Sequence, residues 1–173
     1  RYPNIMNRFI EPISFIGYAL PGVVVGISLV FFGTRFAMPI YQSVFLLILG
    51  YIILFFPVSL GIMRSALIQI NPKIEESAKS LKHSNLSVLT KITIPIMKSG
   101  LLMSLSMVFL LTLKELPATL ILAPLDFHTL ATQVWAYSTE AFFAKSAFPS
   151  LLIILLSVFP LTTIIWHDKR VYQ

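Results

Sequence analysis

Residues 75–82 read Glu-Glu-Ser-Ala-Lys-Ser-Leu-Lys, and residues 92–95 read Ile-Thr-Ile-Pro. This polar, helix-prone segment lies between two apolar runs, 40–63 and 94–113, each long enough to cross the hydrocarbon core of a bilayer. A polar segment between two such runs predicts a loop, residues 64–93, that connects two membrane helices and is accessible from one side of the membrane.

The loop is expected to contain a helix of its own. Pro72 disfavours helical geometry in the residue before it, so the preceding helix should end there and a new one should begin. Within the new helix, Ile74, Ala78 and Leu81 recur at offsets of four and seven and form a narrow apolar stripe. Such a stripe suits lipid headgroups or a groove on a partner protein, and its pattern alone does not choose between them.

Composition places the whole chain in a membrane. Of its 173 residues, 57% are hydrophobic and 12% are charged, which is more apolar surface than one soluble core of this size can bury. Apolar runs of about 20 residues predict four spans. We therefore expect an all-α fold, a polytopic membrane helix bundle forming a single domain over residues 1–173, with spans near 13–32, 40–63, 94–113 and 147–166.

The net charge of +6 permits a nucleic-acid partner, but the distribution of the basic residues argues against one. If the first span runs outward, ten basic residues face the cytoplasm and three face the other side, which is the positive-inside pattern. Both termini and the loop 64–93 are therefore predicted to be cytoplasmic. The ten are Arg1, Arg8, Arg64, Lys73, Lys79, Lys82, Lys91, Lys98, Lys169 and Arg170, and the three are Arg35, Lys114 and Lys145.

Three of the predicted spans contain a proline away from their ends, namely Pro21, Pro57 and Pro160. A proline inside a helix removes one backbone hydrogen bond, and neighbouring helices can compensate for that loss in a membrane. We interpret all three as tolerated kinks that pack against neighbouring helices rather than as breaks that bind substrate.

A second polar interruption, residues 114–120, follows the third span. Lys114 and Glu115 are adjacent, so on a helix they would point about 100° apart and would each need water or a partner on another segment. Pro117 should break the helix there. The pair could be an anchor at the outer interface or part of a permeation path, and the residues alone favour neither. Residues 126–145 are polar enough to form an external excursion with a helical stripe.

The loop resembles the EAA loop of ABC importer permeases. Glu76, Ala78, Ile92, Ile94 and Pro95 fall on the family spacing, whereas Ser77 and Lys82 replace the usual Ala and Gly. The resemblance implies a coupling helix that docks on a nucleotide-binding ATPase subunit. The coupling residues that it implies are Glu76, Ser77, Ala78, Leu81, Lys82 and Pro95. Because Lys at the Gly position disfavours a left-handed turn, we expect the helix to continue through Lys82 as far as His83.

Residues 114–122 and 127–135, with 18–22 and 147–152, look like the C-terminal half of permeases assigned to ferric iron uptake. This resemblance implies a bacterial inner-membrane permease that works with a second permease half and an extracytoplasmic substrate-binding protein. It also makes Lys114, Glu115, Pro117 and Thr119 candidates for the translocation path. Four spans are fewer than this family usually has, so we expect the chain to lack an N-terminal span or to be part of a longer polypeptide.

Other interpretations stay open at this point. Related permeases for thiamine, polyamines or other small solutes share much of the pattern, and a membrane structural or assembly protein could use the loop to bind a cytosolic partner. A passive channel would need a polar face, which only the side of the third span with Ser104, Ser106 and Thr112 begins to offer.

Enzyme chemistry is poorly supported by the sequence. It contains no Gly-rich phosphate loop and no cysteine, and its three histidines lack the spacing of a helical metal site. We therefore expect no catalytic residue, no cofactor and no resident metal, with ATP hydrolysis on a partner.

Overall fold

The computed structural model describes residues 15, 17, 19–80 and 84–168, and every regular element among them is a helix, which confirms the all-α prediction. The predicted coupling residues Leu81 and Lys82, and the expected helix end at His83, lie outside the described residues. The elements are α2 (Gly22–Phe36), η1 (Met38–Ile40), α3 (Val44–Ile68), α4 (Pro72–Ser80), α5 (Asn85–Val88), the π-helix η2 (Leu89–Thr93), α6 (Ile94–Ile96), α7 (Lys98–Leu113), α8 (Pro117–Leu122), α9 (Leu130–Thr139) and α10 (Phe143–Asp168).

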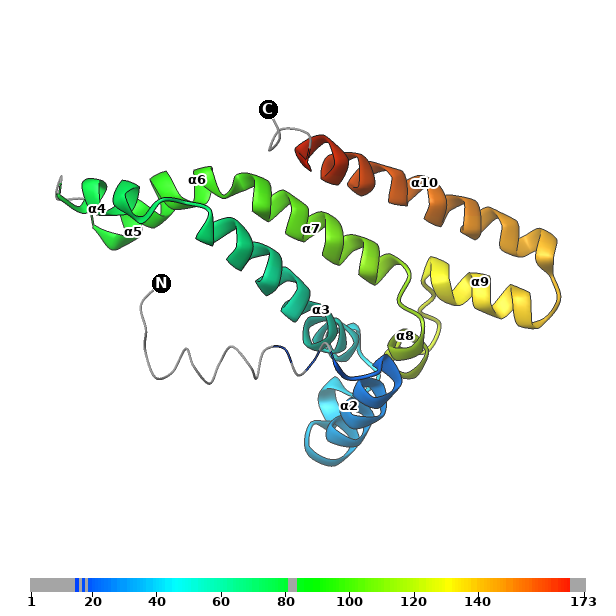
Figure 1. Cartoon of the computed structure of the whole chain (residues 1–173). Helices are drawn as coiled ribbons and strands as arrows, with labels where there is room; N and C mark the ends of the chain where they lie inside the picture. Colours follow the sequence, from blue (N-terminus) through cyan, green and yellow to red (C-terminus); the bar gives the residue numbers. More distant parts are fainter. Residues whose placement is uncertain (1–14, 16, 18, 81–83, 169–173) are drawn as a thin grey trace.

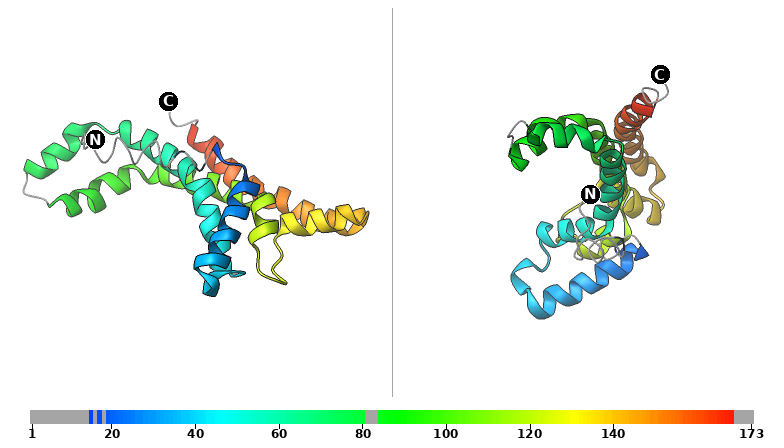
Figure 2. Two further views of the ribbon diagram at one scale, coloured as in Figure 1. Left: turned by 90° about the horizontal axis from the view of Figure 1, so that it is seen from below. Right: turned by 60° about the vertical axis from the view of Figure 1, so that its left-hand side comes forward.

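The helices form an elongated arrangement (Figure 1). At one end of α3 and α7 lie α4, α5 and α6, and at the other end α8 packs beside α2. From there α9 leads away and α10 returns alongside α7, which it contacts. Two further views show the same spread of helices (Figure 2). We call residues 69–97 the loop end, and residues 114–122 with the facing parts of α2 and α3 the α8 end.

The longest apolar helices are α3 and α10. Within the described residues, these two are long and apolar enough to cross a membrane, and a third span results if the bent pair 85–96 and 98–113 is taken as one. Helix α3 begins where the side chain of Ser43 accepts a hydrogen bond from the backbone N–H of Leu46. Pro57 lies inside α3 and Pro160 inside α10, and both are buried, as expected for tolerated kinks.

Pro21 behaves differently from the other two prolines. It is extended, with φ −60° and ψ 140°, and it lies immediately before α2, which begins at the next residue. The prediction of a tolerated kink inside one continuous helix is therefore wrong at this position. Helix α2 has 15 residues and is about 22 Å long, which is shorter than the bilayer core.

The third predicted span is also interrupted. The axis bends by 68° between residues 85–96 and 98–113, and Met97 at the bend has φ −81° and ψ 0°. A π-helix, Leu89–Thr93, lies just before the bend. Helices of this type are rare overall, and those that occur are frequently found at functional sites. The predicted start of the span at Ile94 thus coincides with a short helical turn, and the long straight helix begins at Lys98.

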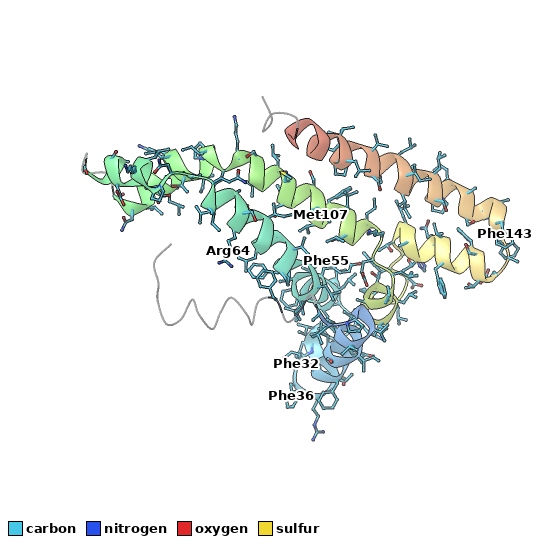
Figure 3. The ribbon with its side chains drawn as sticks, viewed as in Figure 1. Phe32, Phe36, Phe55, Arg64, Met107 and Phe143 are labelled. Carbon is cyan, nitrogen blue, oxygen red and sulfur yellow. The ribbon has the colours of Figure 1, made fainter. Side chains whose placement is uncertain are left out.

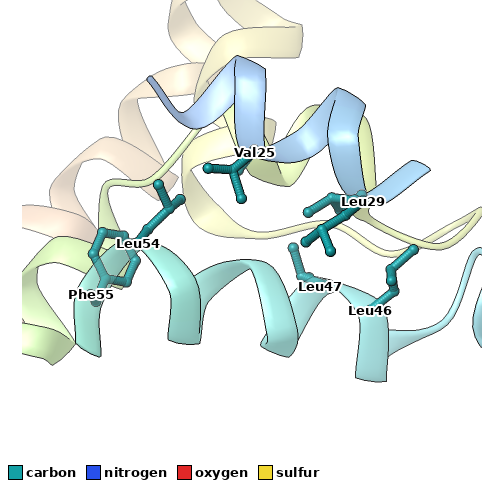
Figure 4. Close-up of a cluster of buried hydrophobic side chains, with 8 residues drawn as sticks. Val25, Leu29, Leu46, Leu47, Leu54 and Phe55 are labelled. Carbon is teal, nitrogen blue, oxygen red and sulfur yellow. The ribbon is translucent and has the colours of Figure 1, made fainter. Parts of the chain in front are cut away.

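The buried core lies between α2, α3 and α8. Figure 4 shows the α2 and α3 side chains that face one another there. The cluster is made up of Val25, Leu29, Leu46, Leu47, Leu54, Phe55, Ala118 and Leu122. Glycines allow the close approach of these helices: a Cβ at Gly50 would lie 2.6 Å from Leu122 Cδ1, and one at Gly26 would lie 3.1 Å from Ile121.

Helices α3 and α7 are joined by small and polar side chains. The hydroxyls of Ser59 and Ser104 are 2.7 Å apart and hydrogen-bond across the pair. Nearer the loop end, a Cβ at Gly100 would collide with Ala66. Such contacts are typical of membrane helix interfaces, where small residues let backbones approach and hydroxyls bond across.

Large apolar side chains cover much of the outside. Phe36 and Phe143, labelled in Figure 3, are both exposed, as are many residues along α2 and α10. Exposed apolar surface on this scale is expected for helices surrounded by lipid or by further membrane helices.

Candidate functional site

A helix, α4, lies where the sequence predicts one in the loop. It begins at Pro72, the first helical position, where a proline's missing N–H costs nothing. Asn71 precedes it, and its side-chain oxygen accepts a hydrogen bond of 3.0 Å from the backbone N–H of Lys73. A cap of this kind satisfies one of the free donors at the start of a helix. The break that Pro72 predicted between α3 and the loop helix is confirmed.

The two faces of α4 have different surroundings. Ala78 is 6% exposed and faces the interior of the loop, whereas Glu76 and Ser77 are exposed. Ile74, from the same predicted stripe as Ala78, is 44% exposed. The stripe is therefore not one uniform surface: Ala78 fixes the position of α4, and the residues available to a partner are Ile74, Glu76 and Ser77.

Pro95, the last predicted coupling residue, lies in α6 and is exposed. It is close in sequence to Thr93, which is 3% exposed and donates a hydrogen bond of 2.9 Å from Oγ1 to Oε1 of Glu75. This bond joins α4 to the π-helix across 18 residues of sequence. The sequence patterns did not pair these two residues, because they lie on different helices and a helical repeat relates only positions on one helix.

At the α8 end, helix α7 ends at Leu113 and α8 begins at Pro117. Lys114 and Glu115 therefore lie beyond the helix rather than on it, and the expected angle of about 100° between them does not apply. Lys114 is exposed and Glu115 is partly buried. Pro117 does not break a helix here; it is the first residue of a new one, and it is exposed.

Glu115 finds a local partner. Its Oε1 accepts a hydrogen bond of 3.0 Å from the backbone N–H of Ala118 in the first turn of α8. The carboxyl group lies against Gly22 of α2, where a Cβ would be 2.8 Å from Oε1. Glycine is thus required at position 22 for the carboxyl group to occupy this place. The expectation that Glu115 needs water or a partner on another segment is wrong, because a backbone N–H three residues later supplies a donor.

Thr119 joins α8 to α3. Its Oγ1 donates a hydrogen bond of 2.9 Å to the backbone carbonyl of Glu115 and lies 2.6 Å from the hydroxyl of Tyr51. Because Thr119 has one hydroxyl proton and gives it to Glu115, the Tyr51 hydroxyl is the donor in the second bond. Thr119 and its neighbour Ala118 are both 0% exposed. The contacts of Tyr51 with Thr119 and of Gly22 with Glu115 were not predicted, because each pair lies far apart in the sequence.

The predicted site residues therefore fall into two groups at opposite ends of α3 and α7. Glu76, Ser77, Ala78 and Pro95 lie at the loop end, and Lys114, Glu115, Pro117 and Thr119 lie at the α8 end. Within the described residues, no group of three or more His, Asp or Glu side chains is placed to hold a metal ion.

Comparison with known proteins gives three relatives. Over 160 residues the chain is 31% identical to the Fe(3+)-transport system permease protein FbpB 2 of Haemophilus influenzae, covering 92% of this chain and 32% of that protein. It is 28% identical over 124 residues to the putative ferric transport system permease protein FbpB 1 of the same organism, covering 70% of this chain and 20% of that protein. It is also 28% identical over 124 residues to the ferric transport system permease protein FbpB of Actinobacillus pleuropneumoniae, covering 70% and 18%.

The chain thus spans about a third of the length of the first of these relatives and less of the other two. A family model described as the inner-membrane component of binding-protein-dependent transport systems matches residues 1–172, nearly the whole chain. The chain therefore belongs to the family of inner-membrane permease components of binding-protein-dependent transport systems.

Proposed function

We propose that this chain forms part of the membrane pore of an ATP-driven importer that moves ferric iron inward across the bacterial inner membrane. The observation that carries the proposal is the exposed Glu76 and Ser77 surface of α4, presented between the two helices α3 and α7 in a chain of this permease family. The substrate is proposed from the three relatives, each of which is described as a ferric or Fe(3+) transport permease.

In this proposal, α4 docks on a nucleotide-binding ATPase subunit. Capping by Asn71 and burial of Ala78 fix α4 in the loop. The exposed face offers a partly exposed Ile74 as an apolar contact and Glu76 as a charge for a basic residue of the partner. Because α4 is connected to α3 on one side and to α6 and α7 on the other, a displacement of the docked helix acts on both.

The remaining partners and the orientation follow the same proposal. The loop end and both termini face the cytoplasm, as the distribution of basic residues favours. An extracytoplasmic binding protein delivers iron to the opposite side, and a second permease half completes the pore. ATP hydrolysis takes place on the ATPase subunit.

The docking proposal is tested in vesicles that contain the complete permease, the ATPase subunit and the binding protein. Glu76→Lys reverses a charge on the exposed face of α4 and is expected to lower ATP-dependent uptake of radioactive ferric iron at least about tenfold, since opposed charges become like charges at the contact. Glu140→Lys is the matched control, because Glu140 is also exposed but lies after α9, away from the loop end. Unchanged uptake by Glu76→Lys would contradict docking through this face.

We also propose that residues 114–119 lie beside the translocation path. An exposed Lys114 next to the partly buried carboxyl group of Glu115 supports this, since ionisable groups at the end of a membrane helix usually face a cavity or a partner. The Glu115 carboxyl group at the mouth would attract a cation. Thr119 and Ala118, which have no exposed surface, contribute by holding this segment in place.

The path proposal is tested by thiol labelling, because the chain contains no cysteine of its own. Single cysteines at Lys114 and Glu115 are expected to react with a membrane-impermeant reagent, and labelling at Glu115 should change when the binding protein or ATP is added. A cysteine at the buried Ala118 should stay unreactive and serves as the control. Labelling at Glu115 that is the same in every state, together with normal transport by Glu115→Gln, would contradict a place beside the path.

A further inference from the structure

The hydrogen bond between Glu75 and Thr93 is a contact inside the loop end that docking alone does not explain. Thr93 Oγ1 donates to Glu75 Oε1 over 2.9 Å, and Thr93 is 3% exposed. Glu75 follows Ile74 and precedes Glu76, yet it is only partly exposed, so it points toward the loop interior rather than toward a docked partner. Adjacent glutamates on one short helix thus have different surroundings.

The behaviour of a nearby threonine shows that this bond is not a default for the segment. Thr90, in the same π-helix, is exposed and donates to the backbone carbonyl of Leu86 in the preceding helical turn, α5, as threonines in helices commonly do. Thr93 donates instead to a side chain of another helix, α4. The bond between Thr93 and Glu75 therefore ties two elements together.

Thr93 lies next to the bend at the base of α7, so its hydrogen bond connects α4 to that bend. Thr93 is the last residue of the π-helix, and four residues later Met97 marks the 68° bend at the base of α7. A group at this point is connected to α7 through one short helical turn, α6. A force applied to Thr93 is thus applied next to the bend.

The packing around the bend is not continuous. A hollow of about 400 Å³ lies between the end of α3, the start of α4 and the bend, lined by residues that include Ile70, Ile74, Ile96 and Met97. Loosely filled space transmits displacement poorly, because side chains can shift into it. The hydrogen bond between Glu75 and Thr93, two residues that do not line the hollow, is a directional connection between α4 and the segment that leads to the bend.

We infer that Glu75 and Thr93 are positioning residues for energy coupling: their hydrogen bond makes the base of α7 follow α4 when the ATPase moves it. This inference rests on the proposed function. Glu76 contacts the partner, and Glu75 carries the movement inward. If α4 moved alone, the Thr93 hydroxyl would be left buried without its acceptor, and burying an unpaired polar group is costly. The two elements are therefore expected to move together.

The central test replaces the Thr93 hydroxyl with a methyl group of the same shape. In vesicles with the ATPase and the binding protein, Thr93→Val should lower the iron transported per ATP hydrolysed by roughly tenfold, the order expected for losing a bond to an ionisable group. Assembly with the ATPase should stay near wild type, because the exposed face of α4 is unchanged. Thr93→Ser retains the donor and should restore the ratio. Thr90→Val, the same change in the same π-helix, should have no effect.

A double-mutant cycle separates the bond from the other interaction that Glu75 makes. Glu75→Leu removes the acceptor, Glu75→Gln retains one, and Glu75→Leu combined with Thr93→Val should lower the transport ratio no further than the worse single variant. Fully additive losses would overturn the inference. So would a Thr93→Val permease with a normal ratio, or one that fails to bind the ATPase, since the bond would then only hold the loop together.

A second measurement does not depend on the substrate. Docking of the ATPase on the complete permease should slow amide hydrogen exchange in residues 89–97 of the wild type and of Thr90→Val, and this protection should disappear in Thr93→Val. If protection persists in Thr93→Val, the movement reaches α7 by another route and the inference is wrong. Wild-type vesicles that take up no iron would instead overturn the proposed substrate, while the exchange result would still decide the role of the bond.

Discussion

The α8 end and the loop end are both built from short helices but are held in different ways. Helix α8 has 6 residues and packs into the main core, where Ala118, Thr119 and Leu122 are all buried. Helix α4 has 9 residues, and most of its side chains are exposed. Its fixed points are the Asn71 cap, the buried Ala78 and the bond from Thr93 to Glu75.

This difference indicates which end finds its packing partners within this chain. At the α8 end, the apolar side chains of the core pack against one another, and the Tyr51 and Thr119 hydroxyls form a hydrogen bond. This part of the molecule therefore provides its own packing. At the loop end, Ile74 is exposed and lines a hollow, and Glu76 is exposed, as expected of a surface that a partner covers. Substitutions at the α8 end should therefore change stability, and substitutions on the exposed face of α4 should change binding.

The largest effect on stability is expected from Leu122→Ala. Leu122 is buried against Gly50, and its removal leaves a cavity in the core, which costs about 2–3 kcal/mol of unfolding free energy. Leu120→Ala is the matched control, because Leu120 lies in the same helix but is exposed. The unfolding free energies of both variants are measured in mixed detergent micelles, with tryptophan fluorescence as the signal. Equal losses in the two variants would show that α8 is not part of the core.

A smaller loss is expected from removing the cap on α8. Glu115→Ala takes the acceptor away from the Ala118 N–H and should cost about 1 kcal/mol, a typical value for a lost helix cap. Glu115→Gln keeps an oxygen acceptor and should retain nearly all of the stability.

The same pair of variants separates the structural role of Glu115 from its proposed role beside the path. If Glu115→Gln is as stable as wild type but transports poorly, the negative charge of Glu115 acts on the transported iron. If Glu115→Gln is destabilised as much as Glu115→Ala, the carboxyl group has a structural role that its hydrogen bond to Ala118 does not describe.

The smallest change in stability is expected on α4. Ile74→Ser removes a partly exposed apolar side chain and should alter unfolding free energy by less than about 0.5 kcal/mol. The affinity of the complete permease for its ATPase should nevertheless fall about tenfold, if Ile74 is buried by docking. Binding in micelles measures the affinity. A variant that loses stability but binds normally would reverse the comparison between the two ends.

Much of the fold followed from the sequence, and the parts that did not have physical reasons. Long apolar runs predicted the helices that became α3 and α10, and Pro72 predicted the start of α4. Hydropathy averages over a window, so it could not show that the chain is extended at Pro21. It also could not show the 68° bend at Met97.

The candidate sites, too, were predicted only in part from the sequence. Residues close in sequence, such as Glu76 and Ala78, were recognised by their spacing, although only the structure separates the exposed one from the buried one. Tyr51 and Thr119 are 68 positions apart, and Glu75 and Thr93 are 18 apart, so their pairing depends on how helices pack. Neither pair leaves a periodic signal.

The π-helix at Leu89–Thr93 has a consequence for how relatives of this chain are compared. A π-turn holds about one residue more than the α-helical turn it replaces, so it is equivalent to a one-residue insertion in a helix whose two ends stay in place. A homologue could lack one residue between Asn85 and Thr93, form a regular α-helix there, and still place its threonine beside the same glutamate. Within this loop, the number of residues separating two positions in an alignment is therefore a poor measure of whether they occupy equivalent places.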